Sequence, residues 1–71
     1  MSSANPYLKN LKSLRKKKGW TQERLARESG ISFHTLIKIE NGRIKNPKLE
    51  TLIKLAKALG VSIDRLVSSQ K

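Results

Sequence analysis

The positions of the glycines are the strongest constraint on how this chain can fold. The four glycines divide the sequence into short blocks, and in each block apolar residues recur three or four positions apart. That spacing is typical of amphipathic helices, and a glycine after the last apolar residue is a common helix stop. No stretch shows the period-two alternation expected of a strand. The sequence therefore predicts an all-α fold of several short helices.

Helix start signals divide the chain further. The first helix is expected over about residues 7–18, and Thr21 and Ser32 can cap the amino ends of the second and third. Asn46-Pro47 opens the fourth helix, and Ser62 caps a short fifth one. We expect one compact five-helix domain over residues 7–67, with a disordered segment over residues 1–6 and a polar tail over residues 68–71.

Composition excludes several classes of protein. A chain of 71 residues has little room for an enclosed substrate cavity, and without cysteine it has no disulfide, zinc finger or thiol nucleophile. His34 is the one histidine and has no nearby acidic partner, so we expect no enzyme, metal, cofactor or small-molecule ligand. No apolar run is long enough to cross a bilayer and residues 1–6 do not resemble a signal peptide, so we expect a cytoplasmic protein.

The net charge points to a partner. Sixteen Lys and Arg residues against five Asp and Glu residues give a formal charge of +11. So large an excess of one sign repels itself within a small fold, and a polyanion such as nucleic acid would relieve it. A merely solvated surface and an anionic membrane surface are the alternatives.

The second and third helices, with a short glycine-containing turn between them, predict a helix-turn-helix unit. Many helical bundles contain such a turn without binding DNA, so the side chains on the third helix must decide. At 3.6 residues per turn, one arc of this helix carries Leu36 and Ile39 and is the expected core face. The opposite arc carries Phe33, His34, Ile37, Lys38 and Asn41.

This outer arc has the chemistry needed to read bases in a major groove. Lys38 can donate to guanine edges, and His34 can donate or accept. Phe33 and Ile37, one turn apart, could meet thymine methyl groups, or they could pack on a neighbouring segment. We interpret these four residues as base-facing.

Phosphate contacts are expected beside the outer arc. Gln22, at the amino end of the second helix, can meet a phosphate together with the free backbone N–H groups. The cationic and amide side chains after the third helix could flank the groove, although a loop of solvated charge is the alternative. These residues are Asn41, Arg43, Lys45 and Lys48.

Several short motifs together resemble a known family. The chain is similar over about residues 8–66 to the Cro and phage-repressor type of helix-turn-helix regulator, also called the XRE family. The motifs are Gly19-Trp20-Thr21-Gln22, Leu25-Ala26, Gly30-Ile31-Ser32, Ile39-Glu40-Asn41-Gly42, Pro47, and Leu55-Ala56-Lys57-Ala58-Leu59-Gly60-Val61-Ser62.

The resemblance implies a five-helix domain of the lambda-repressor-like type that binds a two-fold operator as a homodimer. It also implies a partly buried ion pair between Arg15 and Glu40, joining the first and third helices. Lambdoid phage repressors often carry glutamine where this chain has Phe33 and His34, so their operator sequences do not transfer. Residues 1–6 carry no Lys or Arg, and we therefore expect no arm that wraps around DNA.

Two functions compete at this point. The first is a sequence-specific regulator of transcription, a repressor, that binds double-stranded DNA as a homodimer with its third helices about 34 Å apart. Leu66 and Val67 are the candidate dimer contacts, because the last helix is too short to bury every apolar residue in it. The second is a protein-interaction module, such as an antitoxin or coactivator bridge, in which Phe33 and Ile37 enter a groove of the partner.

Overall fold

The computed structural model describes residues 9–67, and within them it shows five helices and no strand. The expected all-α, five-helix fold is thus confirmed. Residues 1–6 and 68–71, expected to be a disordered segment and a polar tail, lie outside the described residues, as does the expected start of the first helix. The helices are α1 (Lys9–Lys17), α2 (Gln22–Ser29), α3 (Phe33–Glu40), α4 (Leu49–Leu59) and α5 (Ile63–Val67).

Hydroxyl side chains begin three of the helices. Thr21, Ser32 and Ser62 each accept a hydrogen bond from the backbone N–H three residues later, at 3.0, 3.4 and 3.1 Å. Each bond satisfies one of the N–H groups that a helix leaves unpaired at its start. These three start signals in the sequence therefore placed α2, α3 and α5 correctly.

The fourth helix begins later than Asn46-Pro47 indicated. Lys48 precedes α4 with an extended backbone (φ −63°, ψ 151°) and makes no side-chain capping bond, and the helix runs from Leu49. The physical reason lies in the loop before it, where Ile44 packs against the core. This contact holds the loop between α3 and α4, and Pro47 falls in the loop.

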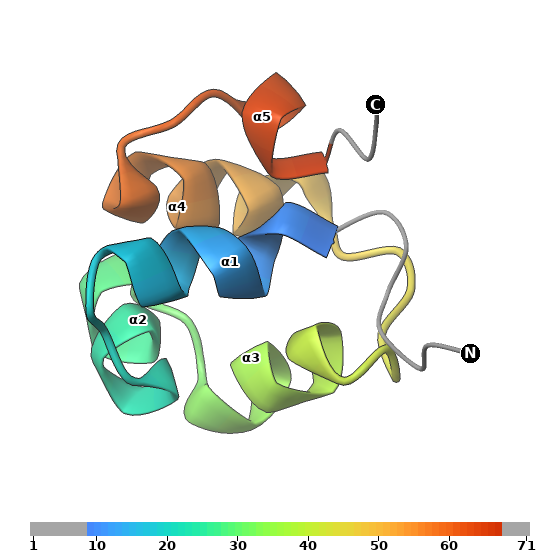
Figure 1. Cartoon of the computed structure of the whole chain (residues 1–71). Helices are drawn as coiled ribbons and strands as arrows, with labels where there is room; N and C mark the ends of the chain where they lie inside the picture. The colour runs from blue at the N-terminus through green and yellow to red at the C-terminus, as the bar shows by residue number, and fades with distance from the viewer. Residues whose placement is uncertain (1–8, 68–71) are drawn as a thin grey trace.

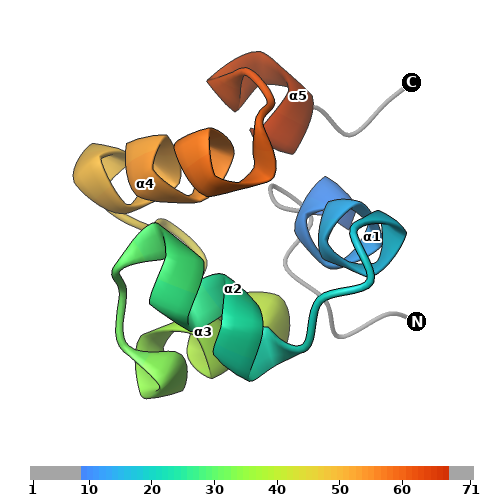
Figure 2. The same cartoon turned by 90° about the vertical axis from the view of Figure 1, so that its left-hand side faces the viewer.

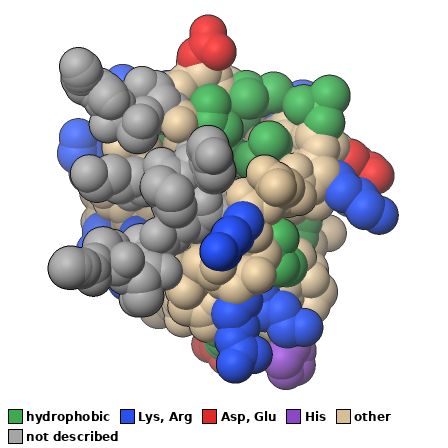
Figure 3. Space-filling view, turned by 90° about the vertical axis from the view of Figure 1, so that its right-hand side faces the viewer, with side chains coloured by type: hydrophobic (Ala, Val, Ile, Leu, Met, Phe, Trp, Pro, Cys, Tyr) green, Lys and Arg blue, Asp and Glu red, His purple; other side chains and the backbone are tan. Residues whose placement is uncertain are grey.

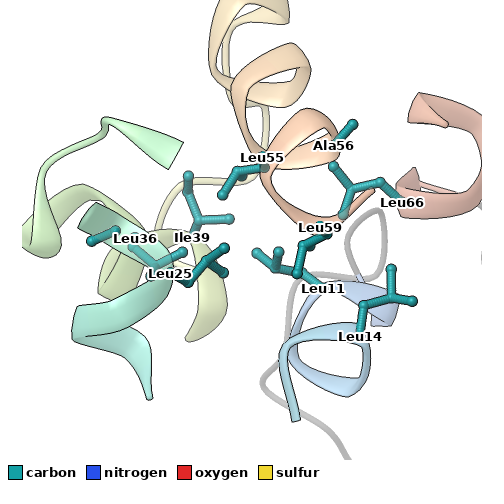
Figure 4. Packing of buried hydrophobic residues seen from close by; sticks show 10 residues of the cluster. Leu11, Leu14, Leu25, Leu36, Ile39, Leu55, Ala56, Leu59 and Leu66 are labelled. Atoms are coloured by element: carbon teal, nitrogen blue, oxygen red, sulfur yellow. The ribbon is translucent and has the colours of Figure 1, made fainter. Parts of the chain in front are cut away.

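One hydrophobic core joins all five helices. Each helix contributes at least one side chain that is essentially inaccessible to solvent, and Figure 4 shows these side chains converging from the different helices. Fully burying a side chain of this size stabilises a fold by about 1.5–3 kcal/mol. The core residues are Leu11, Leu14, Leu25, Ala26, Leu36, Ile39, Leu55, Ala56, Leu59 and Leu66.

The proposal of Leu66 as a dimer contact was wrong. Its side chain is 0% exposed and belongs to the core of the monomer. Although α5 has only five residues, it packs on both α1 and α4, and the Asn10 side chain donates a 2.8 Å hydrogen bond to the carbonyl of Arg65. A helix clamped in this way buries its central leucine and leaves only Val67 and Ile63 half-buried.

The arrangement of the helices leaves one of them uncovered on its outer side. In Figure 1, α1 and α4 occupy the middle of the domain, α5 lies at the top and α3 at the bottom. Figure 2 shows α2 and α3 side by side beneath α4. The outer side of α3 therefore faces away from the rest of the domain.

Candidate nucleic-acid interface

The turn between α2 and α3 is built from a glycine and two buried helix faces. Gly30 has φ of +77°, a left-handed conformation that side chains with a Cβ rarely adopt, and its N–H donates to the carbonyl of Ala26 at 2.9 Å. Leu25 of α2 and Leu36 of α3 are fully buried against each other's helices and the core. The turn and this packing together fix the direction in which α3 leaves α2.

Three of the four predicted base-facing residues are exposed on α3. Phe33 is 37% exposed, His34 and Lys38 are exposed, and Ile37 is half-buried. The rings of Phe33 and His34 meet edge to face, with centroids 6.2 Å apart. An edge-to-face contact of this kind favours one relative orientation of the two rings. We name Phe33, His34, Ile37 and Lys38 the reading face.

Arg15 and Glu40 form a buried, two-bonded ion pair between α1 and α3. Arg15 Nε donates to Glu40 Oε2 at 2.8 Å and Nη2 donates to Oε1 at 3.1 Å. The two side chains are only 9% and 2% exposed. The cost of desolvating such a pair largely offsets its attraction, so its main effect is to fix how α3 sits against α1.

The ion pair is part of a wider network that the sequence did not indicate. Arg15 Nη1 also donates to the carbonyl of Trp20 at 2.9 Å, and Gln22 Nε2 donates to Glu40 Oε1 at 2.8 Å. The carboxylate of Glu40 thus ties together α1, the amino end of α2 and the carboxyl end of α3. No local pattern could have revealed the Gln22 contact, because the two residues are 18 positions apart.

Gln22 was expected at a phosphate, and the structure gives its amide a protein partner. One N–H of the side-chain amide is used by Glu40, and the group has a second N–H and an oxygen. Gln22 is the first residue of α2, where backbone N–H groups lack helical partners. The bond to Glu40 therefore holds the amide at the helix end.

The loop after α3 gathers positive charge beside the reading face. Arg43 and Ile44 both donate backbone hydrogen bonds to the carbonyl of Lys38, at 2.8 and 3.1 Å, so the loop folds back on α3. Asn41 Oδ1 accepts from the N–H of Arg43 at 3.1 Å. The side chains of Asn41, Arg43, Lys45 and Lys48 are all exposed. Figure 3 shows Lys and Arg side chains close to the histidine at the lower end of this face.

Two further cations lie near the amino end of α2, and the sequence analysis did not single them out. Lys18 Nζ and Arg24 Cζ each lie 5.0 Å from the centre of the Trp20 ring. Cations over an indole face are attracted by its electron density, which restrains both side chains. Trp20 flanked by basic residues in sequence was the available signal.

The described residues offer no competing chemistry in this region. Among residues 9–67 there is no group of three or more His, Asp or Glu side chains that could hold a metal ion. None of the helices in that range is long and apolar enough to span a membrane. The arrangement is a cationic, partly apolar surface centred on one exposed helix.

Comparison with known proteins gives consistent matches. Residues 11–66 match a family model described as helix-turn-helix. An uncharacterized HTH-type transcriptional regulator of Sinorhizobium fredii, y4dJ, is 48% identical over 83% of this chain and 75% of its own length. The transcriptional repressor RstR of the cryptic phage CTXphi, from Vibrio cholerae, is 37% identical over 92% of this chain and 58% of its own length.

A solved structure matches both the fold and the sequence. The crystal structure of SinR, the master regulator for biofilm formation, in complex with DNA superposes with a TM-score of 0.80 at 32% identity. The match covers 83% of this chain and 94% of that one. The family model and the curated relatives together confirm the resemblance seen in the sequence. The chain therefore belongs to the helix-turn-helix family of transcriptional regulators, of the Cro and phage-repressor type also called XRE.

Proposed function

We propose that this domain represses transcription by binding double-stranded DNA at a specific sequence, with α3 in the major groove. The observation that carries the proposal is the exposure of Phe33, His34 and Lys38 on a helix whose orientation is fixed by a buried network. An α-helix fits the width of the major groove, where every base pair presents a distinct pattern of groups. Relatives named as transcriptional regulators favour this function over a protein-interaction module.

The reading face supplies two kinds of base contact. Lys38 donates to acceptor groups on guanine, and His34 donates or accepts according to its tautomer. Phe33 and Ile37 meet the methyl groups of thymine. Because the Phe33 ring is held against His34, the two residues act on adjacent bases as one unit.

Phosphate contacts at both ends of α3 fix the position of the domain on the duplex. At one end Gln22 offers its second amide N–H beside the free backbone N–H groups of α2. At the other end the contacts come from the exposed loop after α3, through Asn41, Arg43, Lys45 and Lys48. These contacts carry little sequence information and give the binding its salt dependence.

The domain acts as a homodimer in the cytoplasm and catalyses no reaction. Two copies on a two-fold operator place their α3 helices one turn of DNA apart, about 34 Å. Val67, half-buried at the end of α5, remains a candidate for the contact between the copies. The dimer is a property that the further inference below makes more specific.

Selection of bound duplexes from a random DNA pool tests the proposal. We expect an enriched pseudo-palindrome whose half-sites are centred about 10 base pairs apart. The same selection with Lys38→Ala should lose its preference at one position in each half-site and keep the others. A pool that stays random after several rounds, with retention that depends only on salt, would contradict sequence-specific binding.

A further inference from the structure

Two apolar side chains on α4 are exposed although the core does not need them. Leu49 is 64% exposed and Ile53 is 37% exposed, and with Phe33 they are the large hydrophobic side chains exposed within residues 9–67. Leu49 and Ile53 are four positions apart, so they lie on the same side of α4. Neither belongs to the reading face, and the function proposed above does not use them.

The neighbouring helix extends this apolar area. On α5, Ile63 and Val67 are also four positions apart, and each is only half-buried. α5 packs on α4, and Figure 3 shows hydrophobic side chains gathered in one band across the upper part of the molecule, where these two helices lie. We name Leu49, Ile53, Ile63 and Val67 the α4–α5 face. Contiguous exposed apolar surface on a small domain marks a site of association.

The distribution of charge indicates what covers this face. Residues 9–48 carry twelve basic and three acidic side chains, whereas residues 49–67 carry three basic and two acidic ones. Two copies of a chain with a net charge of +11 repel each other, so they can approach most easily through their least charged surface. A polyanion, by contrast, is attracted to the first region and finds little charge in the second.

Charged groups of both signs lie beside the apolar side chains. Glu50 and Lys54 form an ion pair at 3.8 Å on α4, next to Leu49 and Ile53, and both ends of the pair are exposed. In a two-fold contact a surface meets its own copy, so an acidic group of one copy can face a basic group of the other. This arrangement complements itself without a second kind of protein.

We infer that the α4–α5 face is the surface through which two copies of this chain associate. The inference rests on the proposed function, since it names the contact of the homodimer proposed there. Figure 1 places α3 at the opposite end of the domain from α5, so pairing through α4 and α5 leaves both reading faces uncovered. Leu49 and Ile53 are the central contacts, Ile63 and Val67 extend them, and Leu66 beneath acts only in the core.

Sedimentation equilibrium of the full chain without DNA tests this inference. A double variant, Leu49→Gln with Ile53→Gln, removes exposed apolar groups while the core stays intact. We expect its dissociation constant for self-association to rise by at least about tenfold, with helicity and melting temperature close to those of the unmodified chain. Phe33→Gln is the matched control, because Phe33 is as exposed as Ile53 but lies on the reading face. It should leave self-association unchanged.

Binding to DNA separates the two proposals. A duplex carrying a single half-site should bind the double variant and the unmodified chain equally, whereas a full two-fold site should bind the double variant more weakly. An unmodified chain that stays monomeric at millimolar concentration and on the full site, or a double variant that associates as before, would overturn the inference while leaving DNA binding in place. Normal self-association without any DNA binding would instead overturn the proposed function.

Discussion

The reading face and the α4–α5 face expose apolar side chains to a similar degree but differ in the charge around them. Phe33 and Ile53 are each 37% exposed. Phe33 lies beside His34 and the cationic loop after α3, whereas Ile53 lies beside the paired charges of Glu50 and Lys54. An exposed apolar residue thus does not by itself identify a partner. The surrounding charge assigns one face to a polyanion and the other to a second copy.

The two regions also differ in how the fold holds them. The reading helix is fixed by a polar network centred on Glu40, whereas α5 is fixed mainly by Leu66 in the core. A polar network specifies direction through its bond geometry, while apolar packing contributes stability without a directional requirement. The position of α3 therefore depends on a few hydrogen bonds.

Removing the centre of the network should have the largest effect on stability. Glu40→Ala leaves the guanidinium of Arg15 buried without its carboxylate, and we expect a loss of about 3–5 kcal/mol in the free energy of unfolding. Urea denaturation followed by circular dichroism measures it. Glu28→Ala is the control, since Glu28 pairs with Arg24 on the surface and should cost less than about 1 kcal/mol. Equal losses for the two variants would contradict a special role of Glu40.

Truncating the leucine of the second region should come next. Leu66→Ala leaves a cavity in the core, and we expect unfolding to become easier by about 2–4 kcal/mol. Leu49→Ala, on the exposed side of α4, should change the stability of the monomer by less than about 1 kcal/mol. Thermal melts at low protein concentration compare the two. A larger loss for Leu49 than for Leu66 would reverse our assignment of which leucine is core.

On the reading face, Lys38→Ala should change specificity. We expect a loss of about 1–3 kcal/mol against the preferred duplex and almost none against a duplex altered at the base pair that Lys38 contacts. Fluorescence anisotropy with both duplexes at one salt concentration provides the measurement. If the variant loses the same affinity for every duplex, Lys38 is a phosphate contact and the reading face needs revision.

The smallest effect is expected at the amino end of α2. Gln22→Ala should weaken binding to all duplexes alike, by about 1 kcal/mol, because a phosphate contact carries no sequence information. The bond to Glu40 adds a second expectation, a small loss of stability that Gln22→Glu should deepen by placing two carboxylates together. Anisotropy and urea denaturation on the same samples distinguish the two contributions. An effect confined to one duplex would argue for base contact.

Much of the fold and part of the site could be predicted from local signals. Thr21 and Ser32 marked helix starts because a capping hydroxyl acts within three residues. The outward position of Lys38 followed from the helical period alone. The start of α4 could not be predicted in this way, because the loop before it is held by Ile44 against a core assembled from distant segments.

What the sequence by itself determined is the set of helices, the helix-turn-helix unit and the excess of positive charge, since each depends on neighbouring residues or on composition. Only the tertiary structure decided that Leu66 is core, that Leu49 and Ile53 are exposed, and that Gln22 shares Glu40 with Arg15. These outcomes depend on how helices far apart in the chain pack together. Burial and hydrogen bonding between such helices are set by the whole core, which no local pattern encodes.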